Sequence, residues 1–233
     1  MRRRRPFVAL ISIVAILAAC ISLFRTSCNR EPKYNPTLDQ CLGERMATET
    51  SKLIGGAGDI VVLSVAGGKL SDDVGRAQIK GFREGLRNSK GVRLVAVEGP
   101  ADEDALSRAM NMSGVPEELF LSIVNKYPNV KAMASFLGVP RFYPTGARVD
   151  MSKLPKLVAL DLPLAGTPIG GNLHDLVESG VVSVLIRARP ATGQSQASSK
   201  GDCNSIFNAH YQVVTKENLR ELPDLPQPKP PTE

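Results

Sequence analysis

The sequence predicts an α/β fold: a single lobe built on one doubly wound, mostly parallel sheet, preceded by an N-terminal apolar helix. Two observations indicate the sheet. Short apolar runs alternate along the chain with segments whose apolar residues recur at helical spacing. The runs are rich in Val, Ile and Leu throughout their length, as in parallel strands that are buried on both faces, and most connections between them are short.

The first folded element is a helix. Thr37 or Asp39 can cap its N-terminus, and apolar residues recur every three or four positions as far as Leu53. The glycine-rich stretch 55–58 ends this helix. The continuous, β-branched run 60–65 then predicts a strand buried on both faces.

The same alternation continues along the chain. Further helices are expected at 72–87, 102–112, 116–126 and 173–179. Further strands are expected at 92–97, 130–136, 157–160, 181–186 and 211–214. Residues 191–202 are rich in Ser, Gln and Gly and predict a mobile loop. The lobe therefore covers residues 37–220, and the Pro-rich residues 221–233 predict a disordered tail.

Residues 1–30 predict an export signal that attaches the chain to a membrane. Arg2–Arg5 favour a cytoplasmic N-terminus, and the apolar run 7–24, about 18 residues, is at the lower limit for crossing a bilayer. Two interpretations stay open: a signal anchor, or a lipoprotein signal peptide whose lipobox 17–20 ends in the lipid-bearing Cys20. Residues 31–36 form a stalk, and the lobe is expected at the cell membrane, facing the periplasm or extracytoplasmic side.

The distribution of charge argues against a nucleic-acid partner. The formal net charge is +6, with 29 basic and 23 acidic residues. Residues 1–30 contain six Arg and no acidic residue, so the remaining chain has equal numbers of both signs. A nucleic-acid-binding surface needs a basic excess on the folded part, which is absent here.

The cysteines and the missing motifs limit the chemistry. Cys28, Cys41 and Cys203 follow the apolar run 7–24 and lie on the outer side, where disulfides can persist, and at most one pair can form among three. Cys41–Cys203 is a candidate disulfide, and unpaired buried thiols are the alternative. No Cys or His spacing fits a metal site, and no phosphate loop or nucleophile elbow is present. We therefore expect no metal, no cofactor, no catalytic residues and no enzymatic activity.

The strand ends offer candidate ligand contacts, because ligands of open parallel sheets bind beyond the carboxyl ends of the strands. Asp161 directly follows the strand 157–160 and can accept hydrogens from two ligand hydroxyls. The alternative is a turn residue before Pro163. Arg187 ends the next strand, where simple solvation of the sheet edge is the alternative.

Five segments, in this order, resemble motifs of type 1 periplasmic sugar-binding proteins and of the ligand lobes of lac-repressor-type regulators. They are VGRAQIKGFREGL at 74–86, YPNVKAM at 127–133, LVALD at 157–161, ESGVVSVLIRARP at 178–190 and VTKEN at 214–218. The resemblance covers roughly residues 37–220. That family has two lobes that close on a ligand, and the resemblance implies mainly the second, C-terminal lobe, because the strands of a first lobe would have to precede Thr37.

The resemblance also implies candidate ligand residues. Asp161 matches the ligand-contacting Asp of the family, and Gln78 stands where the family has an Arg, with Arg76 close by. Phe136-Leu137 stand where the family has Asn-Asp, and Ala188 where it has Gln. Asp161, Gln78, Arg76 and Arg187 are thus the expected ligand contacts.

Two functions follow from these expectations. The first is a membrane-tethered, extracytoplasmic, solute-binding-like protein that recognises a small, sugar-like molecule for transport or sensing. Its partners would be a permease, a sensor or a second copy of the chain. The alternative is a degenerate lobe without a ligand that serves as an interaction or scaffold module.

Overall fold

In the computed structural model the chain divides into two units, Met1–Asn35 and Pro36–Glu233. The structure describes residues 34–68, 72–102, 104, 105, 107, 114–141, 154–161, 173–189 and 201–219. Several predicted segments lie outside the described residues: the leader 1–30 with Cys20, residues 31–33 of the stalk, much of the helix 102–112, the loop residues 191–200 and the tail 221–233.

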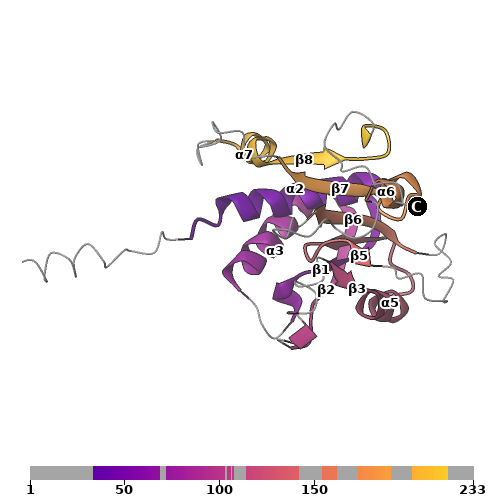
Figure 1. The fold of residues 1–233 in the computed structure, drawn as a ribbon. Helices are drawn as coiled ribbons and strands as arrows, with labels where there is room; N and C mark the ends of the chain where they lie inside the picture. The colour runs from indigo at the N-terminus through magenta and orange to yellow at the C-terminus, as the bar shows by residue number, and fades with distance from the viewer. Residues whose placement is uncertain are drawn as a thin grey trace, which may run out of the picture. The chain divides into compact units, whose positions relative to one another are not determined.

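A six-stranded sheet forms the centre of the second unit, in the order β2-β1-β4-β6-β7-β8 (Figure 1). Its strands are β1 (Ala57–Leu63), β2 (Gly91–Glu98), β4 (Ala132–Ser135), β6 (Lys156–Asp161), β7 (Val184–Ala188) and β8 (Tyr211–Val214). Neighbouring strands are parallel, except that β8 pairs antiparallel with β7. The predicted α/β fold with a mostly parallel sheet is therefore confirmed.

Helices lie on both faces of this sheet. They are α2 (Thr37–Leu53), α3 (Asp73–Leu86), α5 (Glu117–Lys126), α6 (Leu173–Glu178) and α7 (Cys203–His210), with a 3₁₀ turn η1 (Val65–Gly67) after β1. A second, two-stranded parallel sheet pairs β3 (Val115–Pro116) with β5 (Pro140–Arg141). The sequence analysis predicted neither this pair nor α7. It was also wrong about the cap of α2, because the N-cap residue is Pro36 and no side chain caps this end.

Alternation along the strands divides the buried apolar side chains into two cores. One face of the sheet packs against α2, α3 and α7, and its core includes Leu42, Phe82 and Phe207. The other face packs against α5 and α6 through Phe120 and Val177. Figure 1 shows α2 and α3 on one side of the sheet and α5 on the other. The continuous apolar runs of the sequence are thus explained by burial on both faces.

Glycines bring α2 and α3 together at the level of their backbones. A Cβ on Gly43 of α2 would lie 2.0 Å from the carbonyl oxygen of Gln78 on α3. A Cβ on Gly81 of α3 would lie 1.9 Å from the carbonyl oxygen of Gln40 on α2. Only glycine fits at these two positions, since any side chain would push the helices apart.

A disulfide and an aromatic contact join α2 to α7. Cys41 and Cys203 form a disulfide with their Cα atoms 4.9 Å apart. One helical turn further along each helix, the guanidinium of Arg45 lies 5.4 Å from the ring centroid of Phe207. The two pairs form successive contacts between the helices, because residues four apart lie on one helix face.

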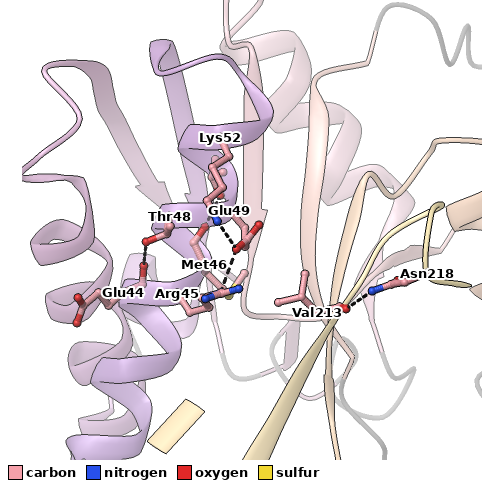
Figure 2. Close-up of polar contacts among 9 residues, drawn as sticks. Glu44, Arg45, Met46, Thr48, Glu49, Lys52, Val213 and Asn218 are labelled. Carbon is pink, nitrogen blue, oxygen red and sulfur yellow. Dashed lines mark hydrogen bonds and ion pairs between the residues drawn. The ribbon is translucent and has the colours of Figure 1, made fainter. Parts of the chain in front are cut away.

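Polar contacts complete this side of the unit. Figure 2 shows Glu49 of α2 between Arg45 and Lys52, at 3.0 Å and 3.2 Å from their nitrogens. The same view shows Asn218, whose amide donates to the Val213 carbonyl over 2.9 Å, while the Thr215 N–H donates to the Asn218 side chain. The VTKEN segment thus forms the turn that follows β8, which is a structural role.

Candidate functional site

The carboxyl edge of the sheet is closed where β1 and β2 end. A Cβ on Gly67 would lie 2.4 Å from the carbonyl carbon of Glu98, and one on Gly99 would lie 2.3 Å from the Ser64 carbonyl oxygen. The Ser64 hydroxyl accepts a hydrogen bond from the Ala66 N–H. The two loops therefore pack backbone against backbone, which leaves no room for a ligand between them.

The end of β2 carries a polar group that was not among the expected ligand contacts. Glu98 accepts hydrogen bonds from the Tyr127 hydroxyl and from the Lys126 ammonium, the latter over 2.8 Å. Burial acts to raise the pKa of Glu98, but the two hydrogen bonds outweigh it and hold the pKa below its usual value. This carboxylate ties α5 to the sheet, and no signal in the sequence pairs residues 28 positions apart.

The end of β4 offers a ligand no exposed polar side chain. Phe136 packs in the core under α2 and α3, and Leu137 packs in the opposite core, each about 5% exposed. Ser135 is fully buried, and its hydroxyl donates to the Gly138 carbonyl over 2.6 Å. Phe136 and Leu137 are thus used for packing. They stand at the positions where the family that the sequence resembles has Asn-Asp.

Asp161 and Arg187 come together at the carboxyl ends of β6 and β7. The two residues are direct partners in the register of these parallel strands. Asp161 Oδ2 lies 3.4 Å from Arg187 Nε, and the Asp161 side chain is only 5% exposed. Its second oxygen, Oδ1, is buried, and no donor in the described part of the chain hydrogen-bonds to it. A buried carboxylate oxygen without a donor is costly, and a ligand hydroxyl could satisfy it.

The surroundings of Asp161 favour its neutral form. Burial raises the pKa of Asp161, and the charge of Arg187 lowers it only in part. The ion pair therefore does not fully compensate the loss of water around the carboxylate. A carboxyl group in this state can accept a hydrogen bond from a ligand, and when protonated it can also donate one.

Gln78 and Arg76 lie away from this pair. Gln78 on α3 is buried against α2, where its amide donates to Asp39 Oδ1 over 3.1 Å. Arg76 forms an ion pair with Asp73 on the surface of α3. Leu160 packs under α2 and α3, so the adjacent Asp161 points to the opposite face of the sheet. The structure brings Asp161 and Arg187 together and does not bring Gln78 to them.

The described residues include no group of three or more His, Cys, Asp or Glu side chains that could hold a metal ion. None of the described helices is long and apolar enough to cross a membrane.

The comparisons with known proteins concern the fold. No protein-family profile matches the chain, and no curated protein is similar to it in sequence. Among solved structures, an ABC transporter solute-binding protein from Agrobacterium vitis, bound with α-D-tagatopyranose, matches with a TM-score of 0.50 and 15% identity. That match covers 80% of this chain and 59% of the other.

Two further matches have lower scores. A solute-binding protein from Burkholderia graminis in complex with D-arabinose has 19% identity and a TM-score of 0.49, covering 79% of this chain and 62% of the other. AraP, an arabinose-binding protein from Geobacillus stearothermophilus, has 16% identity and a TM-score of 0.46, covering 78% and 62%. The chain thus spans less than two thirds of each of these proteins, and over that span it has the fold of the ABC transporter solute-binding proteins.

Proposed function

We propose that the folded unit is a membrane-tethered, extracytoplasmic, solute-binding-like module that recognises a small, sugar-like molecule. The observation that carries this proposal is the buried Asp161, whose Oδ1 has no donor within the described residues and whose Oδ2 faces Arg187. The pair stands at the carboxyl edge of the sheet, where ligands of open α/β sheets bind.

The chemistry of the pair suits a polyhydroxylated molecule. The unpaired Asp161 oxygen can accept a hydrogen from a ligand hydroxyl, and Arg187 can donate to a ring or hydroxyl oxygen. The sugars bound by the solved structures of the same fold have this chemistry.

The proposed location has independent support. The disulfide between Cys41 and Cys203 would persist in the periplasm or outside the cell, and cytosolic proteins rarely keep such a bond. The predicted signal in residues 1–30 points to the same side of the membrane and provides the tether. A permease or a membrane sensor is the partner that this location favours.

Binding of sugars to the full-length chain in detergent micelles tests the proposal. We would measure the melting temperature with D-arabinose, D-allose and D-tagatose. A ligand at about 100 times its Kd adds about 2.7 kcal/mol, which is roughly 5–10 °C for a domain of this size. Asp161→Asn should abolish the shift. Asp59→Asn, on the opposite edge of the sheet, should leave the shift unchanged.

One alternative function has its own observations. Phe136 and Leu137 are buried in the two cores, and Gln78 is bonded to Asp39, so these positions offer a sugar nothing. A scaffold module without a ligand would need none of these contacts. If no sugar shifts the melting temperature, or if the shift survives Asp161→Asn, the scaffold function is favoured and the site proposed here is wrong.

A further inference from the structure

A second concave site lies at the other edge of the sheet. It has a volume of about 460 Å³, within the range of small-molecule sites. The end of α2 and the starts of β4 and β6 line it, with Leu53, Ile54, Gly55, Val130, Lys131, Leu154, Pro155 and Lys156. We call it the amino-edge pocket. None of these residues was among the expected ligand contacts, although Val130 and Lys131 belong to the YPNVKAM segment.

The two lysines of the pocket come from neighbouring strand starts. The Lys156 N–H donates to the Lys131 carbonyl, so their backbones are adjacent. The Lys131 ammonium donates to the Ala57 carbonyl over 3.2 Å, and the Lys156 ammonium donates to the Leu53 carbonyl over 3.0 Å. Both ammonium groups are therefore held against the same short connection, which runs from the end of α2 to the start of β1.

Both lysines keep donors in reserve. An ammonium group has three N–H donors. The ammonium groups of Lys131 and Lys156 each make one hydrogen bond to the described chain. The other carbonyls near the end of α2 are already used, since the N–H groups of residues 54–56 donate to Thr50, Lys52 and Ser51. The remaining lysine N–H groups are not needed by these three carbonyls, and an anion can accept hydrogen bonds from them.

The charge of the pocket is positive and its walls are apolar. None of the eight described lining residues is acidic, and Leu53, Ile54, Val130, Leu154 and Pro155 supply aliphatic surface. Asp59 lies close enough to Lys131 to feel its charge, but Arg93 forms a bidentate pair with that carboxylate. The positive charge of the two lysines thus stays largely uncompensated beside an apolar surface.

We propose that the amino-edge pocket binds a small organic anion: a carboxylate or phosphate group carried on an aliphatic or aromatic body. The ammonium groups of Lys131 and Lys156 hold the charged group, and the apolar walls cover the body.

This pocket is independent of the Asp161 site. β6 begins at Lys156, in the pocket, and ends at Asp161, so the two sites are separated by about 17 Å along one strand. The proposal therefore does not rest on sugar binding. Ligands of the two sites should bind together without competing.

Calorimetric titration of the full-length chain in detergent micelles tests the proposal. The probes are benzoate, hexanoate and phenyl phosphate, with benzamide and hexanamide as neutral counterparts and acetate as an anion without an apolar body. We expect the three anions to bind at least about tenfold more tightly than the neutral amides, because two ammonium groups contact the charge. Acetate should bind more weakly than hexanoate, because it leaves the walls uncovered.

Substitutions locate the site. Lys131→Met and Lys156→Met together should weaken hexanoate binding at least about tenfold, each alone should have part of this effect, and the exposed Lys90→Met should have none. Circular dichroism should show that the variants are folded at the temperature of the titration. Equal binding of anions and amides, unchanged binding by the folded double variant, or no binding of any probe would each overturn the proposal. Asp161→Asn should leave anion binding unchanged.

Discussion

The two faces of the sheet use their polar groups differently. On the face of α2, α3 and α7, Thr50 donates to the Met46 carbonyl and Gln78 to Asp39. The buried Nε of Arg45 makes no hydrogen bond there, but it is in an ion pair with Glu49 over 3.0 Å. Close-packed glycines and a disulfide hold this face together. On the other face, at the carboxyl end of β6, Asp161 has a buried oxygen that the described chain does not pair. The contacts that stabilise the fold are thus concentrated on the face of α2, α3 and α7. The unpaired carboxylate oxygen, which lowers stability and can serve a ligand, lies on the other face.

Removing the disulfide should cause the largest loss of stability on the face of α2, α3 and α7. Cys41 and Cys203 are 162 residues apart, and closing a loop of that length stabilises the fold by about 5 kcal/mol in the chain-entropy model. The double variant Cys41→Ser, Cys203→Ser should therefore melt at least about 10 °C lower. Differential scanning calorimetry of the full-length chain measures this, with Cys28→Ser as the control. An unchanged melting temperature would show that α7 needs no covalent link to α2.

A single methyl group between α2 and α3 should have the next largest effect. Alanine favours a helix over glycine by about 1 kcal/mol, so propensity alone predicts that Gly43→Ala is stabilising. The new Cβ would instead meet the Gln78 carbonyl oxygen, and we expect a net loss of about 2–3 kcal/mol.

Chemical denaturation measures this loss, and Gly201→Ala is a matched control. The nearest atom to a Cβ on Gly201 is 3.5 Å away, an ordinary contact, so its stability should change little. If Gly43→Ala is as stable as Gly201→Ala, the helices can separate without cost and the close packing of this face has no energetic role.

Substitution of Asp161 should have the smallest effect on folding stability, and it should stabilise the protein where the two changes above destabilise it. The pKa of Asp161 is raised by burial, so the native state binds this proton more strongly than the unfolded chain does. Protonation of Asp161 therefore contributes to folding stability below the pKa of the unfolded chain. This contribution is lost as the pH rises through the raised pKa of the native state. Asp161→Asn should therefore stabilise the ligand-free protein at pH 7 by about 1 kcal/mol, and have almost no effect near pH 3.

Melting curves of the wild type and Asp161→Asn between pH 3 and pH 7 measure this difference. Asp59→Asn is a useful contrast, because the hydrogen bond from Arg93 lowers the pKa of Asp59 and its pH dependence should have the opposite sign. A lower melting temperature of Asp161→Asn at pH 7 would mean that the ion pair with Arg187 outweighs burial. The carboxylate would then stabilise the fold, and the comparison of the two faces would fail.

Much of the sheet could be predicted from the sequence, because residues buried on both faces must be apolar at every position. The strand predicted at 157–160 is an example. The helix that ends at Leu53 was predicted from its apolar residues at helical spacing. The helix α7 was missed because a polar stretch precedes it, although Asp202 caps it and Cys203, Ile206 and Phe207 are spaced as i, i+3 and i+4. The pair β3–β5 has two residues in each strand, too few to form a pattern.

The candidate site was less predictable than the fold. The end of β6 could be located from the apolar run before Asp161, but its partner depended on the register of β6 and β7, which pattern alone does not give. The resemblance placed Gln78 at the site. Gln78, however, lies four residues before Phe82, and this spacing puts both on the face of α3 that is buried. Helical periodicity could have identified its packing role.

The disulfide also has a consequence for the order of events during synthesis. Cys41 is in the first helix of the lobe and Cys203 in the last, so the bond cannot form until nearly the whole chain is made. At roughly 5–20 residues per second, Cys41 waits about 8–30 s for its partner. Cys28 is made before Cys41 and is available to it throughout that interval. Correct oxidation therefore requires Cys41 to pair with Cys203, the more distant of the two cysteines, and not with Cys28.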